Sequence, residues 1–242
     1  TIGLKLEFYN PASSVKDRVG RAIIEAAEAG GGKSVHLVDE PMAAAVGLGL
    51  SVEEPVARLV LDVGGGTSEG VLISMGAIAF SESRRVAGDE ATHAIIRYLR
   101  NKYGLSVGEN TAEHIKMTIG SAMPLEELHT FNCRGKELSR GIPREVELTS
   151  DDIREALKEI VEEFIDMVKR LTTQAPPELS ADLVRQGVYL TGGGSLLKGL
   201  DRRLAQEIGL RVNIPDDPLL SVVLGLGRIL ENMNYYRSVF VS

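Results

Sequence analysis

The sequence contains no tryptophan, a single cysteine and few aromatic residues, which make up only 5% of its 242 positions. A hydrophobic core must therefore be built mainly from aliphatic side chains, and the hydrophobic fraction of 43% is enough for a core of normal size. The one thiol, Cys133, excludes an internal disulfide and is typical of a reducing compartment. We therefore expect a cytoplasmic protein in which Cys133 has a structural role.

Several other features are missing as well. No apolar run reaches the roughly 18 residues of a membrane-spanning helix. Residues 1–10 show neither a signal-peptide pattern nor an initiating methionine, so we expect a fragment or a processed chain, and membrane contact is left open. The net charge of −7 argues against nucleic acid as the main partner. The four histidines show no metal-ligand spacing: His36, His93, His114 and His129.

Hydrophobic periodicity and turn residues indicate helices and strands along the whole chain. A capping-box pattern at Thr149 precedes a helix whose apolar positions form one core-facing stripe. Residues 131–148 lack a helical period and contain glycine and proline, which predicts a hairpin and loop. The other predicted strands cover residues 35–38, 59–63, 70–74, 77–83 and 188–191, and the other predicted helices cover residues 15–29, 88–103, 111–119 and 195–208, with one more opening at Pro41.

Two of the predicted strands run directly into a glycine triplet. Residues 59–63 are followed by Gly64, Gly65, Gly66 and Thr67, and residues 188–191 by Gly192, Gly193 and Gly194. Glycine lets a backbone approach a phosphate closely, and the N–H groups of such a turn form an anion-binding nest. A tight turn without a ligand explains either triplet alone. Two triplets at strand ends, one of them preceded by a carboxylate, favour a phosphate site.

Two carboxylates stand where phosphate chemistry would use them. Asp62 ends an apolar strand, where burial without a partner is costly, and Mg²⁺ bound through water is a suitable partner. The alternative is an aspartate that caps the following turn. Glu40 precedes Pro41 at the start of a predicted helix and is placed to polarise a water for attack on phosphorus. The alternative is a helix N-terminal acid favoured by the helix dipole.

These motifs, in this order and spacing, resemble the MreB family of bacterial actin-like proteins, whose wider relatives are actin, sugar kinases and DnaK-type chaperones. The resemblance implies an α/β nucleotide-binding fold of the actin/DnaK-chaperone (ribonuclease H-like) type, truncated at its N-terminus. It also implies a cell-shape cytoskeletal protein that binds Mg-ATP, hydrolyses it and assembles with further copies into filaments. It extends over residues 34–230 and rests on residues 38–45, 62–67, 87–89, 111–116, 176–179 and 190–194.

The resemblance implies a role for each matching residue. Asp62 is expected to hold Mg²⁺ through water, and Glu40 to orient the attacking water. Glu113 and Lys116 are expected to contact the ribose and to flank the base. The backbone positions follow the glycine motifs: Gly64, Gly65, Gly66 and Thr67 lie near the β- and γ-phosphates, and Gly192, Gly193 and Gly194 line the adenosine pocket.

One departure from the family concerns the phosphate clamp. The family begins with a strand–turn–strand segment that supplies a second phosphate loop and a further metal-side aspartate, and we find no match to it or to the small upper subdomain that follows it. ATP binding and hydrolysis by this chain alone are therefore open. The alternative is an actin-like scaffold without turnover.

A second departure lies in residues 5–18, which resemble cysteine synthase, a pyridoxal-phosphate enzyme. In that family the lysine that matches Lys16 forms the Schiff base with the cofactor. The comparison predicts a chimera, with a cysteine-synthase-like segment in residues 1–33 and an MreB-like region in residues 34–242. No other cysteine synthase motif follows, and the alternative for Lys16 is a solvated lysine in the first turn of a helix.

Overall fold

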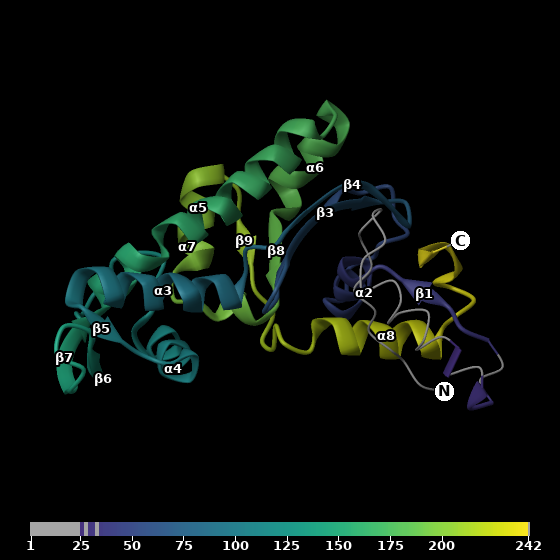
Figure 1. Cartoon of the computed structure of the whole chain (residues 1–242). Helices are drawn as coiled ribbons and strands as arrows, with labels where there is room; N and C mark the ends of the chain where they lie inside the picture. Colours follow the sequence, from purple (N-terminus) through teal and green to yellow (C-terminus); the bar gives the residue numbers. More distant parts are fainter. Residues whose placement is uncertain (1–24, 27–28, 32–33, 242) are drawn as a thin grey trace.

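The computed structural model describes residues 25–26, 29–31 and 34–241, and Figure 1 shows their arrangement. Lys16 and most of the helix predicted over residues 15–29 lie outside the described residues. The segment boundary expected after residue 33 falls at the edge of the described part. None of the helices in the part that is described combines the length and apolar character needed to cross a bilayer.

A mixed five-stranded sheet lies in the middle of the molecule (Figure 1). Its strand order is β4-β3-β2-β8-β9, in which β2 is antiparallel to β3 but parallel to β8. The strands predicted at residues 59–63, 70–74, 77–83 and 188–191, and the hairpin that follows the first glycine turn, are confirmed, whereas the edge strand β9 was not predicted. The strands are β2 (Arg58–Val63), β3 (Ser68–Ser74), β4 (Ala77–Arg84), β8 (Val188–Thr191) and β9 (Val212–Asn213).

Two smaller sheets lie on either side of this one in Figure 1. One consists of β5 (Leu105–Ser106), β6 (Thr130–Glu137) and β7 (Pro143–Thr149), which confirms the hairpin predicted for residues 131–148. The other pairs β1 (Leu37–Val38) with β10 (Phe240–Val241), so the strand predicted at residues 35–38 is shorter than expected.

The helices cover the sheet and frame its edge. They are α2 (Glu40–Gly47), α3 (Gly88–Tyr103), α4 (Glu109–Ile119), α5 (Ser150–Gln174), α6 (Pro177–Gln186), α7 (Leu200–Ile208) and α8 (Ser221–Glu231), with short 3₁₀ turns η1 (Gly193–Leu196) and η2 (Arg237–Val239).

Strand β2 is buried along its whole length and belongs to two hydrophobic cores. Because side chains alternate along a strand, Leu59 and Leu61 join the core that contains the apolar stripe of α5, whereas Val60 joins the core around α2. Asp62 follows Val60 by two residues and so projects to the α2 side. This alternation places Asp62 on the same side of the sheet as Glu40.

Helix α5 is fixed at its start by the predicted capping box. The Thr149 side chain accepts a hydrogen bond from the Asp152 backbone N–H, and the Asp152 carboxylate accepts one from the Thr149 N–H. The predicted stripe is confirmed, since all its members are buried: Ile153, Leu157, Ile160, Phe164, Met167 and Leu171. Helix α5 contacts the core mainly through this buried stripe.

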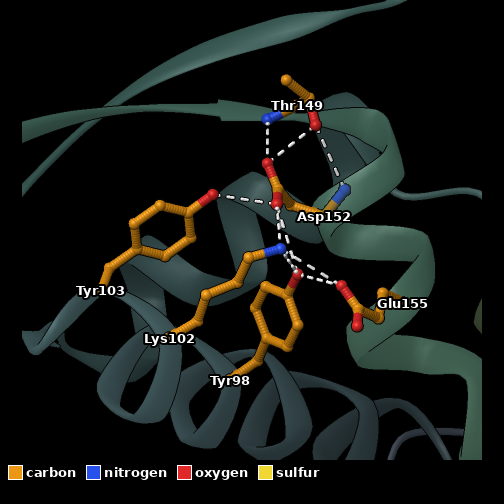
Figure 2. A network of polar contacts seen from close by, with 6 residues as sticks. All are labelled: Tyr98, Lys102, Tyr103, Thr149, Asp152 and Glu155. Atoms are coloured by element: carbon orange, nitrogen blue, oxygen red, sulfur yellow. Dashed lines mark hydrogen bonds and ion pairs between the residues drawn. The ribbon is translucent and has the colours of Figure 1, made fainter.

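A polar network joins the end of α3 to the start of α5 (Figure 2). The Asp152 carboxylate accepts hydrogen bonds from Lys102 at 2.9 Å and from the Tyr103 hydroxyl at 2.9 Å. Tyr98 donates to Glu155 at 2.5 Å and accepts from Lys102 at 2.6 Å. Burial raises the pKa of Asp152, but the hydrogen bonds from Lys102, Thr149 and Tyr103 outweigh it and lower this pKa well below its ordinary value.

Helices α2 and α8 approach so closely that glycine is required at their contact. A Cβ atom on Gly225 would collide with the backbone carbonyl of Ala43, and one on Gly47 would collide with the backbone carbonyl of Ser221. The small residues of α2 therefore allow the close packing that their sizes predict. Cys133 is also buried, as a structural thiol should be, and burial raises its pKa.

Candidate functional site

The two glycine turns meet at one edge of the central sheet. Strands β2 and β8 are parallel neighbours, with Asp62 opposite Thr191, so the turns that follow them emerge side by side. A cavity of about 760 Å³ opens at this edge and is lined by both turns. Open α/β sheets bind ligands in such crevices at the carboxyl ends of their strands.

The cavity brings together most of the predicted site residues. Gly66 and Thr67 complete the first turn, in which the Gly64 N–H donates to the Thr67 carbonyl at 2.9 Å, but they are not among the lining residues. The predicted residues that do line the cavity are Glu40, Asp62, Gly64, Gly65, Glu113, Lys116, Gly192, Gly193 and Gly194.

The second turn needs glycine because two strand ends approach each other there. Gly192 has a φ of +81°, and a Cβ atom on it would collide with Asp62 Oδ1 and with the Val63 carbonyl. A Cβ atom on Gly194 would collide with the Val63 side chain. These glycines therefore allow the second turn to lie directly against the end of β2.

The helix predicted over residues 195–208 begins later than expected. The triplet leads into the 3₁₀ turn η1. Gly199 follows in the left-handed conformation, with a φ of +73°, and α7 starts after it at Leu200. The expectation that the N-terminus of an α-helix directly follows this triplet was wrong. A single 3₁₀ turn, with its i to i+3 hydrogen bonds, stands in its place.

The first turn is held by the N-terminus of α3. The Gly88 N–H donates to the Gly64 carbonyl at 3.1 Å, and the Asp89 N–H donates to the Gly65 carbonyl at 2.8 Å. A Cβ atom on Gly88 would lie only 3.3 Å from the Gly64 oxygen, so glycine keeps this contact short. Two N–H groups that α3 cannot use internally are thus satisfied by the turn.

Four carboxylates line the cavity: Glu40, Asp62, Asp89 and Glu113. The Asp62 residue is only 7% exposed. In the described part of the chain, no three acidic, histidine or cysteine side chains are grouped closely enough to hold a metal ion by themselves. One buried carboxylate beside a phosphate-type turn nevertheless suits Mg²⁺, which keeps several waters and shares its coordination with phosphates.

Asp89 is a lining residue to which the sequence analysis assigned no role, although it belongs to the motif at residues 87–89. Its Oδ1 atom lies 3.6 Å from the position that a Cβ on Gly65 would occupy. Besides this motif, the sequence offered only its place as the second residue of a helix after a glycine, a position that also suits an ordinary helix N-terminal acid.

Lys116 and Glu113 form an ion pair on α4 at the side of the cavity. Lys116 Nζ lies 2.6 Å from Glu113 Oε2, and the Lys116 side chain is only 15% exposed. Burial raises the pKa of Glu113, but hydrogen bonds from Lys116 and Thr92 outweigh it and lower this pKa below its ordinary value. Glu113 is therefore a carboxylate, an acceptor for hydroxyl groups, at neutral pH.

Much of the remaining cavity wall is apolar. Helix α5 contributes Leu157, Ile160 and Phe164, and α8 with the segment before it contributes Leu219 and Val223. Small-molecule sites typically combine such an apolar wall with a few convergent polar groups. The cavity therefore suits a ligand with an anionic end beside the glycine turns and a flat apolar part.

Comparisons with known proteins agree with this arrangement. The family model described as MreB/Mbl protein matches residues 11–238. The chain is 44% identical over 216 residues to the cell shape-determining protein MreB of Escherichia coli K12, covering 89% of this chain and 62% of that protein. It is 41% identical over 214 residues to Mbl of Bacillus subtilis, covering 88% and 64% of the two chains.

Solved structures show the same fold. MreB5 of Spiroplasma citri bound to AMPPNP superposes with a TM-score of 0.86 at 31% identity, covering 92% of this chain and 67% of that chain. The MamK double helical filament, at 19% identity and a TM-score of 0.74, covers 91% and 66%. The α/β actin-like fold predicted from the sequence is therefore confirmed.

The family match also bears on the N-terminal segment. It begins at residue 11 and includes Lys16, within the stretch that we compared with cysteine synthase. These comparisons support neither that second resemblance nor a chimera. The chain spans less than two thirds of the length of the curated relatives it matches. From its glycine turns, its fold and the match over residues 11–238, the chain belongs to the MreB/Mbl family.

Proposed function

We propose that the cavity at the ends of β2 and β8 binds Mg-ATP, and that this chain is part of a cytoskeletal protein whose assembly depends on the nucleotide. The observation that carries the proposal is the meeting of two glycine turns beside the buried Asp62. The S. citri relative, MreB5, is described bound to AMPPNP and to ADP. Its similarity to this chain supports the same ligand class here.

In this proposal the triphosphate lies against Gly64, Gly65 and Gly66, whose backbone can approach it closely. Asp62 holds Mg²⁺ through water, and the ion, when bound, neutralises charge on the phosphate oxygens. The cavity also contains Glu40, on the Asp62 side of the sheet, which we assign to orienting the attacking water. Since phosphoryl transfer depends on positioning and electrostatics, rigid placement of these groups is the main contribution of the chain.

The adenosine end lies between α4 and the second glycine turn. Gly192, Gly193 and Gly194 leave space for the nucleoside because they carry no side chains. The Glu113 carboxylate suits the ribose hydroxyl groups as a hydrogen-bond acceptor. The apolar wall from α5 and α8 suits the faces of the base.

The alternative is an actin-like scaffold without turnover. The chain spans 62% of the length of E. coli MreB, so the activity of the whole relative is a proposal for this chain. Filament assembly is proposed from family membership, and the cytoplasmic location stays a prediction. No observation on the described residues supports pyridoxal-phosphate chemistry at Lys16.

The proposal is tested by the melting temperature of the purified chain with and without Mg-ATP. A ligand that binds only the folded state at about a hundredfold over its Kd stabilises by about 2.7 kcal/mol, which is roughly a 5–10 °C rise for a domain of this size. Asp62→Ala should abolish the rise, because it removes the metal-side carboxylate. The control is Asp166→Ala, which removes the same charge from the exposed side of α5. This variant should keep the rise in melting temperature.

Phosphate release and pelleting with Mg-ATP, measured on the same samples, separate the two candidate functions. A melting rise with phosphate release and pelleting supports the nucleotide-dependent cytoskeletal protein. A melting rise without either supports the scaffold. No rise at millimolar Mg-ATP, or an equal rise in Asp62→Ala, would contradict nucleotide binding at this cavity.

A further inference from the structure

A second cavity lies between α5, α7 and the segment 122–124 that follows α4. Its volume is about 450 Å³, which is within the range of small-molecule sites. None of the described residues lines both this cavity and the larger one at the glycine turns. Helix α5 lines the larger cavity with Leu157 and Ile160, and it lines this one with Lys158 and Val161. We call the second cavity the α5–α7 cavity.

Cationic side chains line the α5–α7 cavity from both helices. Arg154 and Lys158 line it from α5, and Arg203 lines it from α7. Arg154 and Lys158 are four residues apart, so they are neighbours on one face of α5. Two like charges at this spacing repel each other, and an anion bound between them would relieve the repulsion.

Acidic side chains pair with two of these three cations. Arg154 donates a hydrogen bond to Asp151, and Arg203 Nη2 lies 2.9 Å from Glu162 Oε1. Arg203 also pairs through Nη1 with Glu207, at 2.9 Å. Arg203 is therefore held by two carboxylates and joins α7 to α5, whereas Arg154 has one.

Lys158 is the lining cation that these acids leave unpaired. Its partners at helical spacing on α5 would be Glu155 and Glu162, but Glu162 is already paired with α7. Glu155 accepts hydrogen bonds from Tyr98 and Lys102 of α3 (Figure 2). Within the part of the chain that the structure describes, Lys158 takes part in no ion pair. The three N–H donors of its ammonium group are thus open to a ligand.

Part of the wall of the α5–α7 cavity is apolar. Ala122 and Val161 are only 8% and 4% exposed, and Met123, which also lines the cavity, is half-buried. Such a wall contributes to affinity only when a ligand covers it with an apolar group. A hydrated inorganic ion would leave this wall uncovered.

We propose that the α5–α7 cavity binds a small apolar carboxylate, with the carboxylate on Lys158 and Arg154 and the apolar group on the wall around Val161. The planar guanidinium of Arg154 suits a carboxylate, and among the described residues only Asp151 accepts from it, so most of its five N–H donors remain. The acids at the cavity disfavour a doubly charged group such as a phosphate. A free acid and the C-terminal end of a polypeptide present the same chemistry. The proposal is independent of nucleotide binding at the larger cavity.

Methionine methyl signals report on the two cavities separately. Met123 lines the α5–α7 cavity and Met117 lines the larger one, so NMR of the methyl-labelled full chain compares them. N-acetyl-leucine carries a carboxylate beside an apolar side chain, and N-acetyl-leucinamide lacks the charge. The proposal expects N-acetyl-leucine to shift the Met123 signal and to bind about tenfold more tightly than the amide, which corresponds to about 1.4 kcal/mol. An unchanged Met123 signal, a shift of Met117 in its place, or equal affinities of acid and amide would overturn it.

Two variants separate a direct contact from a loss of positive charge. Lys158→Gln removes the unpaired ammonium group and should weaken N-acetyl-leucine binding about tenfold. Arg202→Gln removes a charge from the exposed surface of α7, outside the cavity, and should leave the affinity unchanged. Both side chains are exposed, so both variants should fold. Equal weakening in the two variants would mean that only the charge of this surface matters, which overturns the proposal.

A short acetylated peptide that ends in leucine distinguishes the two sources of the carboxylate. If the peptide with a free C-terminal carboxylate binds at least as tightly as N-acetyl-leucine, the cavity accepts the end of a polypeptide. If this peptide does not bind, the ligand is a small free acid. Tight binding of the same peptide with an amidated C-terminus would overturn the proposal, because that peptide has no carboxylate to offer Lys158 and Arg154.

Discussion

At the scale of single residues, Asp152 should contribute more to the free energy of unfolding than the neighbouring acid Asp151. It is buried and accepts hydrogen bonds from Lys102, Tyr103 and Thr149. We predict that Asp152→Asn lowers the free energy of unfolding by about 2 kcal/mol at pH 7, since an amide cannot accept all these charge-assisted bonds. Urea denaturation of the variant and the wild-type chain measures this difference.

The pH dependence of that difference follows from the lowered pKa of Asp152 in the folded state. A carboxyl with a depressed folded pKa stabilises fully above its unfolded pKa of about 4 and loses this contribution as pH falls toward the folded value. The gap between wild type and Asp152→Asn should therefore be constant near neutrality and shrink below about pH 4. Asp151→Asn is the control, because Asp151 pairs with Arg154 at the surface and should cost about 0–1 kcal/mol. A gap that widens on acidification would contradict this assignment.

Single residues also show how far the sequence could predict the site. Asp62 and the two glycine triplets were identifiable because each ends a continuous apolar strand, which is a local pattern. The contact of Lys116 with Gly88 joins residues 28 positions apart, and no local pattern reports it. The place of Asp89 on the cavity wall was missed for the same reason, since it depends on the glycine turn that the fold brings next to it.

At the scale of elements, the contact between α2 and α8 should tolerate no added methyl group. A Cβ on Gly225 would collide with the Ala43 carbonyl, and a backbone atom cannot move aside as a flexible side chain can. We predict that Gly225→Ala lowers the free energy of unfolding by about 1–3 kcal/mol, since overpacking outweighs the higher helix propensity of alanine. Thermal and urea denaturation measure this change.

The matched control lies in the same helix. Gly227 belongs to α8, and a Cβ on it would meet no atom within 4 Å. Gly227→Ala should therefore be neutral or stabilising by about 0.5–1 kcal/mol, because glycine is a poor helix former. Equal destabilisation by both substitutions would show that the close approach of α2 and α8 is not what makes Gly225 necessary.

Element boundaries mark the other limit of prediction from sequence. The capping box of α5 was predicted correctly because Thr149 and Asp152 lie three residues apart in the sequence and bond to each other in the structure. Helix α7 was predicted to start at residue 195, five residues before its actual start at Leu200. Periodicity does not distinguish a 3₁₀ turn from the first turn of an α-helix, and the positive φ of Gly199 that separates them depends on how the chain packs.

At the scale of the whole molecule, the cavity lies where two hydrophobic cores meet along β2. One core contains α5 and the other contains α2, and residues of β2 alternate between them. The cavity wall takes Leu157 and Phe164 from the first side and Glu40 from the second. A ligand that fills the cavity therefore contacts elements of both cores, and its binding free energy opposes any opening that separates them.

This geometry predicts how a nucleotide changes the opening of the molecule. Hydrogen exchange of the chain with Mg-ATP should slow in α2 and in the buried half of α5 together, because both contribute to the cavity that the ligand closes. Mg²⁺-tripolyphosphate should slow exchange in the first turn of α3, which holds Gly64 and Gly65, but should slow it less in α5, whose contribution is the apolar wall. Asp62→Ala should remove both effects. Protection confined to α5 with Mg-ATP would mean that the ligand occupies the apolar wall without engaging the glycine turns, and the phosphate site would then have to lie elsewhere.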